Sequence, residues 1–211
     1  LLTAANSYKG GTQVDGGTLN VGVTGAVGTG PVGVSSGAAL IFSGSADAES
    51  LKITAGAAQS GNGGFVQFQD NASAGHATLT AHAGGSIDFR GNATAGNATI
   101  ENRGGEVMVW FNAKAGKTHI TNFAGGTTYL WGDASAEQAT IVNERDGVLD
   151  IRDNATAAQA SVVNKAGGTV FLSKLGTPGI TIGSLEGAGR VLLGAKALTT
   201  GALNTDTEIS G

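Results

Sequence analysis

Short runs of alternating apolar and polar residues recur along the chain in pairs separated by turn residues. The first run of each pair reads VQF, IDF, VMV, TYL, LDI, VFL and VLL in successive copies, and the second reads ATL, ATI, THI, ATI, ASV and ITI. Alternation with a period of two is typical of a β-strand with one buried face. Asn-Ala and Ala-Gly stand between the runs, and Gly-Gly or Asp-Gly follows the second, which favours turns. The pattern predicts two short strands per repeat and no helix.

The copies follow one another at 21 residues, with one step of 20. Equivalent apolar positions of the first run are Phe68, Phe89, Val109, Leu130, Ile151, Leu172 and Leu193. An earlier copy places Phe42 at the same position, with about five extra residues in the segment 55–64. A repeat of about 20 residues with two or three short strands is typical of one coil of a parallel β-solenoid. We therefore expect an all-β chain of roughly ten coils, forming a rod roughly 50 Å long at the strand spacing of about 4.8 Å.

Stacking the coils turns equivalent positions into columns, and three columns are apolar enough to form the core. The first contains Val66, Ile87, Val107, Thr128, Leu149, Val170 and Val191, and the second contains Phe68 and its equivalents. The third contains Leu79, Ile100, Ile120, Ile141, Val162 and Ile182. We expect all three to point inward.

Two further columns are rich in asparagine. One contains Asn102, Asn122, Asn143 and Asn164, and the other contains Asn71, Asn92, Asn112, Asp133 and Asn154. Asparagine tolerates the left-handed backbone conformation found at strand ends. Its amide can also bond the matching turn of a neighbouring coil, so we interpret both columns as structural.

Composition excludes several classes of protein. Among 211 residues there are 37 glycines, 2 prolines and no cysteine, and the net charge is −4. Without cysteine there can be neither a disulfide scaffold nor a thiolate metal site. Charged residues are sparse and form no basic stripe, so no nucleic-acid partner is expected. No apolar run approaches the roughly 18–20 residues of a membrane helix, so we expect no membrane insertion by this segment.

The titratable residues do not suggest catalysis. A glycosidase needs two carboxyl groups about 5–9.5 Å apart, whereas Asp88 and Asp150 are three coils, or about 14 Å, apart. Asp150 and Asp153 share one coil, but Asp153 falls at a turn. The three histidines occupy different columns and predict no metal site; they are His76, His82 and His119. We expect no enzyme activity and no cofactor.

One outward cluster is unusual because it is aromatic. Trp110 and Trp131, the two tryptophans of the chain, lie 21 residues apart and are therefore predicted to stack on adjacent coils. The candidate ligand or partner patch comprises them and their expected neighbours Met108, Tyr129, Asp88, Arg90, Asp150 and Arg152. An exposed aromatic patch framed by charges is suited to bind a sugar, a peptide or a protein face. Alternatively, the aromatics only stabilise neighbouring strands, or another part of a larger protein covers them.

The ends of the chain carry a longer phrase. "SYKGGTQVDGGTLNV" (residues 7–21) and "GAVGTGPVGVSSGAAL" (residues 25–40) resemble the autotransporter-associated β-strand repeat of bacterial type V secreted passenger proteins. The matching residues are Tyr8, Gly10, Thr12, Val14, Gly17, Thr18, Leu19, Gly28 to Pro31, Gly37, Ala38 and Leu40. Residues 182–211 look like the segment that commonly precedes such a repeat in these proteins. The resemblance covers roughly the first 40 and last 30 residues.

The resemblance implies a right-handed parallel β-helix on, or released from, a Gram-negative cell surface after export through the periplasm and outer membrane. It transfers no catalytic residue. We expect a single solenoid segment of a larger passenger, with residues 1–40 as the associated repeat, 41–181 as regular coils and 182–211 leading into a probable next repeat. The expected partners are a surface glycan, a protein of a host or neighbouring cell, or a second copy.

The expected function is a non-enzymatic structural or adhesive rod. Two alternatives remain. One is a carbohydrate-binding or polysaccharide-cleaving β-helix. The other is an ice-binding face built on an outward column of Thr78, Thr99, Thr140 and Thr181, which His119 and Ser161 interrupt.

Overall fold

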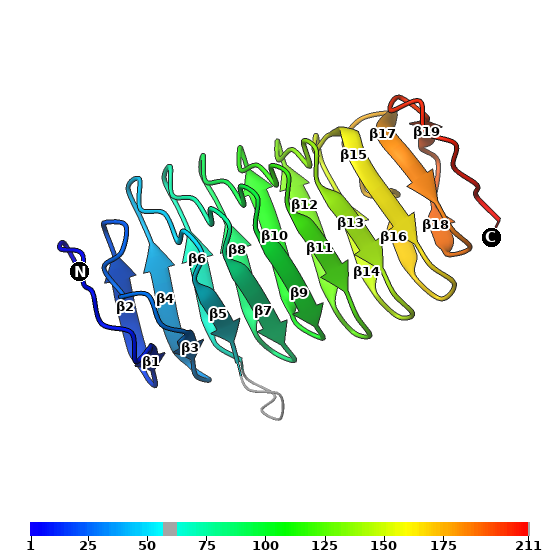
Figure 1. Ribbon diagram of the computed structural model, residues 1–211. Helices are drawn as coiled ribbons and strands as arrows, with labels where there is room; N and C mark the ends of the chain where they lie inside the picture. The colour runs from blue at the N-terminus through cyan, green and yellow to red at the C-terminus, as the bar shows by residue number, and fades with distance from the viewer. Residues whose placement is uncertain (57–62, 211) are drawn as a thin grey trace.

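The chain folds as a parallel β-solenoid, as its repeat predicts. The computed structural model describes residues 1–56 and 63–210, and all regular structure in these ranges is β. About nine turns of about 21 residues stack into a rod (Figure 1). Most of the five-residue insertion expected in the segment 55–64 lies outside the described residues. In the described part of the chain, no helix is long and apolar enough to span a bilayer.

Successive strands alternate between two parallel sheets, so that each coil contributes one strand to each sheet. The ten-stranded sheet contains β1 (Thr12–Val14), β3 (Val32–Val34), β5 (Lys52–Ala55), β7 (Thr78–His82), β9 (Thr99–Arg103), β11 (His119–Asn122), β13 (Thr140–Asn143), β15 (Ala157–Asn164), β17 (Gly179–Glu186) and β19 (Ala197–Thr200). The nine-stranded sheet contains β2 (Gly17–Val21), β4 (Ala38–Phe42), β6 (Phe65–Phe68), β8 (Ser86–Phe89), β10 (Glu106–Phe111), β12 (Thr127–Gly132), β14 (Val148–Ile151), β16 (Thr169–Phe171) and β18 (Arg190–Leu192).

The core lies between the two sheets and contains the predicted columns, together with buried alanines that the sequence columns did not include, such as Ala74 and Ala95. Phe42, Phe68 and Phe89 stack inside the rod with ring centroids 4.8 and 4.9 Å apart and nearly parallel planes. Their register partners are those expected from the repeat. Val191 and Leu193, in the last coil of the predicted columns, are only partly buried. Burial of apolar surface is the main force that holds the two sheets together, and it contributes about 25 cal/mol for each Å² removed from water.

The predicted third core column is wrong at its last member. Ile120 lies between Ile100 and Ile141 as expected, but Val162 pairs with Leu185, whereas Ile182 pairs with Ala157. A bulge in β15 between Ala157 and Ser161 causes this shift, because β15 has more residues than β17 across that interval. Extra residues in one strand displace every later pair in the register. Ile182 remains buried against a different neighbour.

The first asparagine column forms a hydrogen-bonded ladder inside the rod. Each amide nitrogen donates to the side-chain oxygen of the next member, at 3.0, 2.9 and 3.2 Å from Asn102 to Asn164. The amides also donate to the backbone carbonyl of the first residue of a strand in the next coil, such as that of Thr127 in β12. This is the structural role expected for the column. None of its members has the left-handed conformation that their position at a strand end suggested.

Candidate functional site

The two tryptophans lie side by side on the outer face of the nine-stranded sheet. Trp110 in β10 pairs directly with Trp131 in β12, and their ring centroids are 6.0 Å apart. The Arg90 guanidinium lies 4.6 Å from the Trp110 ring centroid, and that of Arg152 lies 5.6 Å from Trp131. These four side chains form one continuous row, which we name the aromatic stack. Cation–π contacts of this kind add about 0.5–1 kcal/mol each at exposed sites.

Met108 and Tyr129 lie beside the aromatic stack on the same strands. They pair with each other, and their outer neighbours in the register are Asp88 and Asp150 respectively. The Arg152 guanidinium is 5.1 Å from the Tyr129 ring as well. The structure thus brings all eight residues of the predicted patch together on four consecutive coils.

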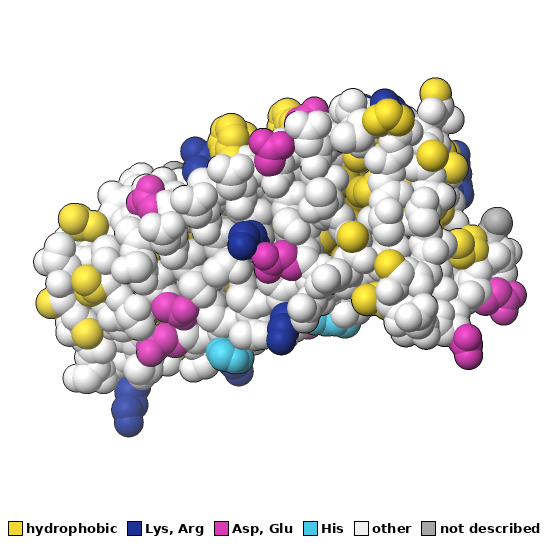
Figure 2. Space-filling view, turned by 90° about the horizontal axis from the view of Figure 1, so that it is seen from above, with side chains coloured by type: hydrophobic (Ala, Val, Ile, Leu, Met, Phe, Trp, Pro, Cys, Tyr) yellow, Lys and Arg dark blue, Asp and Glu magenta, His cyan; other side chains and the backbone are white. Residues whose placement is uncertain are grey.

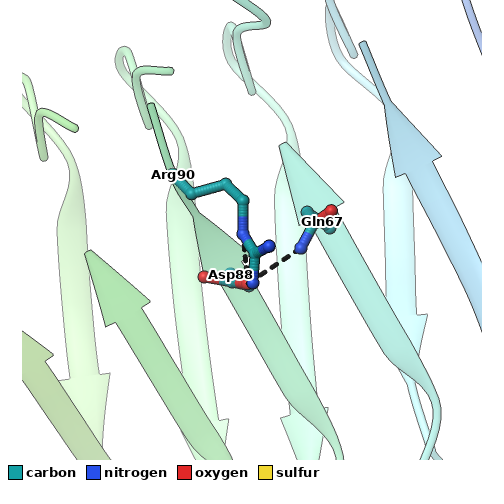
Figure 3. Close-up of polar contacts among 3 residues, drawn as sticks. All are labelled: Gln67, Asp88 and Arg90. Atoms are coloured by element: carbon teal, nitrogen blue, oxygen red, sulfur yellow. Dashed lines mark hydrogen bonds and ion pairs between the residues drawn. The ribbon is translucent and has the colours of Figure 1, made fainter. Parts of the chain in front are cut away.

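The two aspartates of the patch, however, do not frame an exposed surface. Asp88 is 0% and Asp150 6% exposed. Each is covered by the arginine two residues later, which forms an ion pair with it at 3.0 Å for Arg90 and 2.6 Å for Arg152. The amide of Gln67 also donates to Asp88, at 3.0 Å (Figure 3). The aspartates therefore hold the arginines in place against the indole rings.

Burial changes the acidity of this face. Desolvation raises the pKa of Asp88 above its ordinary value, and the hydrogen bond from Gln67 and the charge of Arg90 offset only part of this effect. The indole N–H of Trp110 also acts to lower the pKa of Asp88, although its geometry falls short of a hydrogen bond. Burial likewise raises the pKa of Tyr129.

Sequence reasoning missed Phe111, the most exposed aromatic residue of this region. Its side chain is 55% exposed and stacks on Trp110 with the centroids 4.9 Å apart. Its backbone φ is 58°, in the left-handed region that a bulky residue rarely adopts. The equivalent residues of neighbouring coils also have positive φ and are Asp70, Gly91, Gly132 and Asp153. An aromatic in a column of glycine and aspartate was the available signal.

Two open pockets of about 260 Å³ adjoin the aromatic stack. One is lined by Glu106, Met108, Tyr129, Trp131 and Arg152. The other is lined by Trp110, Phe111, Trp131, Gly132 and Asp153.

A larger hollow, about 640 Å³, lies elsewhere and is lined by Gly96, Asn97, Gly116, Lys117, Ser135, Glu137, Gln138, Thr156, Ala158 and Gln159. It lies over turns and the start of β15, and none of the predicted site residues lines it. We place the candidate site at the aromatic stack because large aromatic side chains are exposed there.

The remaining polar columns carry no assembled site. No group of three or more His, Asp or Glu side chains suited to a metal ion is found in the described ranges. In the outward threonine column, Ser161 was expected to pair with Thr181, but it pairs with Ser184. The predicted column therefore ends before Thr181. The β15 bulge that displaces Ile182 explains this shift too.

Neither family models, nor curated proteins, nor solved structures gave a match to this chain. Function must therefore be inferred from the fold and from the side chains of the aromatic stack.

Proposed function

We propose that this chain is a non-enzymatic, structural and adhesive rod segment of an autotransporter passenger, displayed on or released from a bacterial surface. The phrase at residues 7–40 supports the passenger origin. The uninterrupted stack of coils from β1 to β19 supports the role of a spacer, because each added coil lengthens the rod without needing a larger core.

The observation that carries the adhesive part is the aromatic stack. Trp131 is 40% exposed, and the two ion pairs hold the flanking arginines of the stack in position. Exposed tryptophan and arginine on a rigid support are the residues that contribute most to protein–protein contacts. Their partner is a surface molecule of a host or neighbouring cell, or a second copy of the chain.

The charge distribution agrees with a partner other than nucleic acid. On the face shown in Figure 2, side chains of both signs are interspersed along the rod and form no continuous basic stripe. The stack offers a glycan a poor platform. Each indole already has an arginine near one ring face and the other indole stacked against it, so a sugar would have little free ring surface to cover.

A double substitution tests the proposal. Beads coated with the chain should adhere to cells, and Trp110→Ala combined with Trp131→Ala should abolish adhesion while circular dichroism and thermal unfolding change little. Outward side chains leave no core cavity when truncated. Phe123→Ala is the matched control, because Phe123 has an arginine, Arg103, 4.4 Å from its ring but lies away from the stack. Adhesion that survives the double substitution would show that the stack is only structural.

A further inference from the structure

The corner of the coil that precedes the ten-stranded sheet is capped by a hydroxyl side chain. Ser73, Thr94 and Ser135 occupy the same position of this corner on three of the coils. Each hydroxyl oxygen accepts a hydrogen bond from the backbone nitrogen two residues later, at 2.9, 3.0 and 3.1 Å. A short polar side chain that binds a nearby backbone group in this way is a common turn device. On these coils the turn therefore uses its own backbone donor.

One coil breaks this pattern at Lys114. Lys114 stands between Thr94 and Ser135 in the ladder of bridges, where a hydroxyl residue is otherwise found. A lysine side chain has no acceptor. The Gly116 N–H, equivalent to the capped ones, therefore has no acceptor among the described residues. The capping hydroxyls lie on outward side chains, so this N–H also points to the outer surface.

The hollow of about 640 Å³ lies over this free donor. Gly116, Lys117 and Ser135 are among its lining residues. Its volume falls within the usual range of about 300–1,000 Å³ for ligand sites. The lining extends from Gly96 to Thr156 across four coils, or about 14 Å at the strand spacing. The hollow is therefore long enough for a ligand larger than a simple ion.

The hollow has one positive charge that no carboxylate neutralises. Lys117 is the one cation among its lining residues, and Glu137 is the one carboxylate. Glu137 forms an ion pair of 3.3 Å with Lys114, outside the lining. None of the ion pairs in the described part of the chain includes Lys117, which is exposed. A free ammonium group thus lies beside a free backbone N–H.

We propose that this hollow binds a sugar that carries a carboxylate. The Gly116 N–H and the Lys117 ammonium donate to the carboxylate, and such charge-assisted hydrogen bonds are about twice as strong as neutral ones. Side-chain amides along the hollow both donate and accept, as sugar hydroxyls require; they belong to Asn97, Gln138 and Gln159.

One lysine and one N–H match a group with a single negative charge, and Glu137 would repel a second. The site shares no residue with the aromatic stack, so the inference goes beyond the proposed function and does not depend on it.

A titration with sialyllactose, a trisaccharide with one carboxylate, tests the proposal. The amide resonance of Gly116 in a nitrogen–proton correlation spectrum should shift saturably as sialyllactose is added. The methyl ester of sialyllactose has the same skeleton without the charge, and acetate has the carboxylate without the sugar. Each should bind at least about tenfold more weakly. No saturable shift, or equal affinity for sialyllactose and either control compound, would overturn the proposal.

Substitutions at the two lysines separate the charge from the backbone donor. Lys117→Gln should weaken sialyllactose binding at least about tenfold. Lys114→Ser restores the capping hydroxyl, which should take up the Gly116 N–H, whereas Lys114→Met removes the same charge and supplies no oxygen. Both variants free Glu137, so the weaker binding expected for Lys114→Ser isolates the contribution of the N–H.

Lys165→Gln is the matched control, because Lys165 is an exposed lysine paired with Glu144 at another turn. It should bind sialyllactose as the unmodified chain does. Unchanged affinity in Lys117→Gln, or equal affinity in Lys114→Ser and Lys114→Met, would contradict the proposed contacts.

The outcome is distinguishable from failure of the proposed function. The double tryptophan variant should bind sialyllactose normally, whether or not it loses adhesion. Loss of sialyllactose binding in that variant would place the sugar at the aromatic stack and overturn the assignment to this hollow.

Discussion

Thr118 places a hydroxyl group in a column that otherwise consists of buried alanines. Its equivalents on neighbouring coils are Ala77, Ala98, Ala139 and Ala160, all buried at the same corner. Thr118 is fully buried too, and its hydroxyl has no hydrogen-bond partner among the described residues. An unpaired buried polar group costs about 1–3 kcal/mol.

We expect Thr118→Ala to raise the free energy of unfolding by about 1 kcal/mol, because removal of the hydroxyl outweighs the loss of about 0.8 kcal/mol for one buried methyl group. Urea denaturation measures the change. Thr118→Val, which retains the branched shape, should also stabilise. A loss of stability in both variants would mean that the hydroxyl is satisfied, for instance by a bound water.

Asp88 should make stability depend on pH in an unusual direction. Burial raises its pKa in the folded chain above the ordinary aspartate value of 3.8. The folded state therefore holds this proton more tightly than the unfolded state does, and stability is gained as pH falls from the folded pKa toward 3.8. The same stability is lost as pH rises through the folded pKa.

Asp88→Asn removes this titration and keeps an oxygen for Gln67 and Arg90. The free energy of unfolding of the unmodified chain, minus that of the variant, should therefore increase as the pH is lowered from neutral to about 4. Urea titrations at a series of pH values give this difference. A difference that is constant, or that shrinks with falling pH, would contradict the assigned burial effect.

At the scale of the strand, the register decides which face each residue occupies. Ile120 in β11 is fully buried between Ile100 and Ile141, whereas Thr99, next to Ile100 in β9, is exposed. Ile120→Asp should lower the free energy of unfolding by about 4 kcal/mol or more, because it buries an unpaired charge. Thr99→Asp should cost less than about 1 kcal/mol. Chemical denaturation of both variants checks the register, since a one-residue slip would exchange their effects.

The sequence predicted the strands and their pairing wherever the phrase was regular. Alternation sets the face and the 21-residue step sets the neighbour, so the Phe68 column and the pairing of the two tryptophans followed from counting. The bulge in β15 could not be counted, because residues 172–181 lack the Ala-x-Ala corner that marks the six preceding coils. Without that corner, nothing in the pattern shows how many residues the turn uses.

The sequence predicted which residues of the candidate site lie side by side, but not how far each side chain is exposed to solvent. Alternation shows that Asp88 points away from the core, yet exposure depends on what covers it, and Arg90 folds back over it from two residues away. Phe111 was missed for a different reason. It stands at a corner, where side-chain direction follows the backbone conformation rather than strand alternation.

At the scale of the whole molecule, contacts repeat along one direction, from each coil to the next. Strands contact mainly their neighbours one coil before and after, and the phenylalanine and asparagine ladders repeat this pairing inside the rod. Stability is then approximately a sum of similar contributions from each coil and its contacts. A local change such as Thr118→Ala should therefore act where it is made, without altering distant coils.

The direction of the ladders sets the response of the rod to force. The strands run across the long axis, so the hydrogen bonds between coils lie along it (Figure 1). Tension applied to the two chain ends is carried by the outermost coil first, whose bonds break one after another rather than together. Each released coil of about 21 residues adds up to about 70 Å of slack. The segment would therefore lengthen one coil at a time under tension, so that the force on a contact made at its aromatic stack would rise gradually.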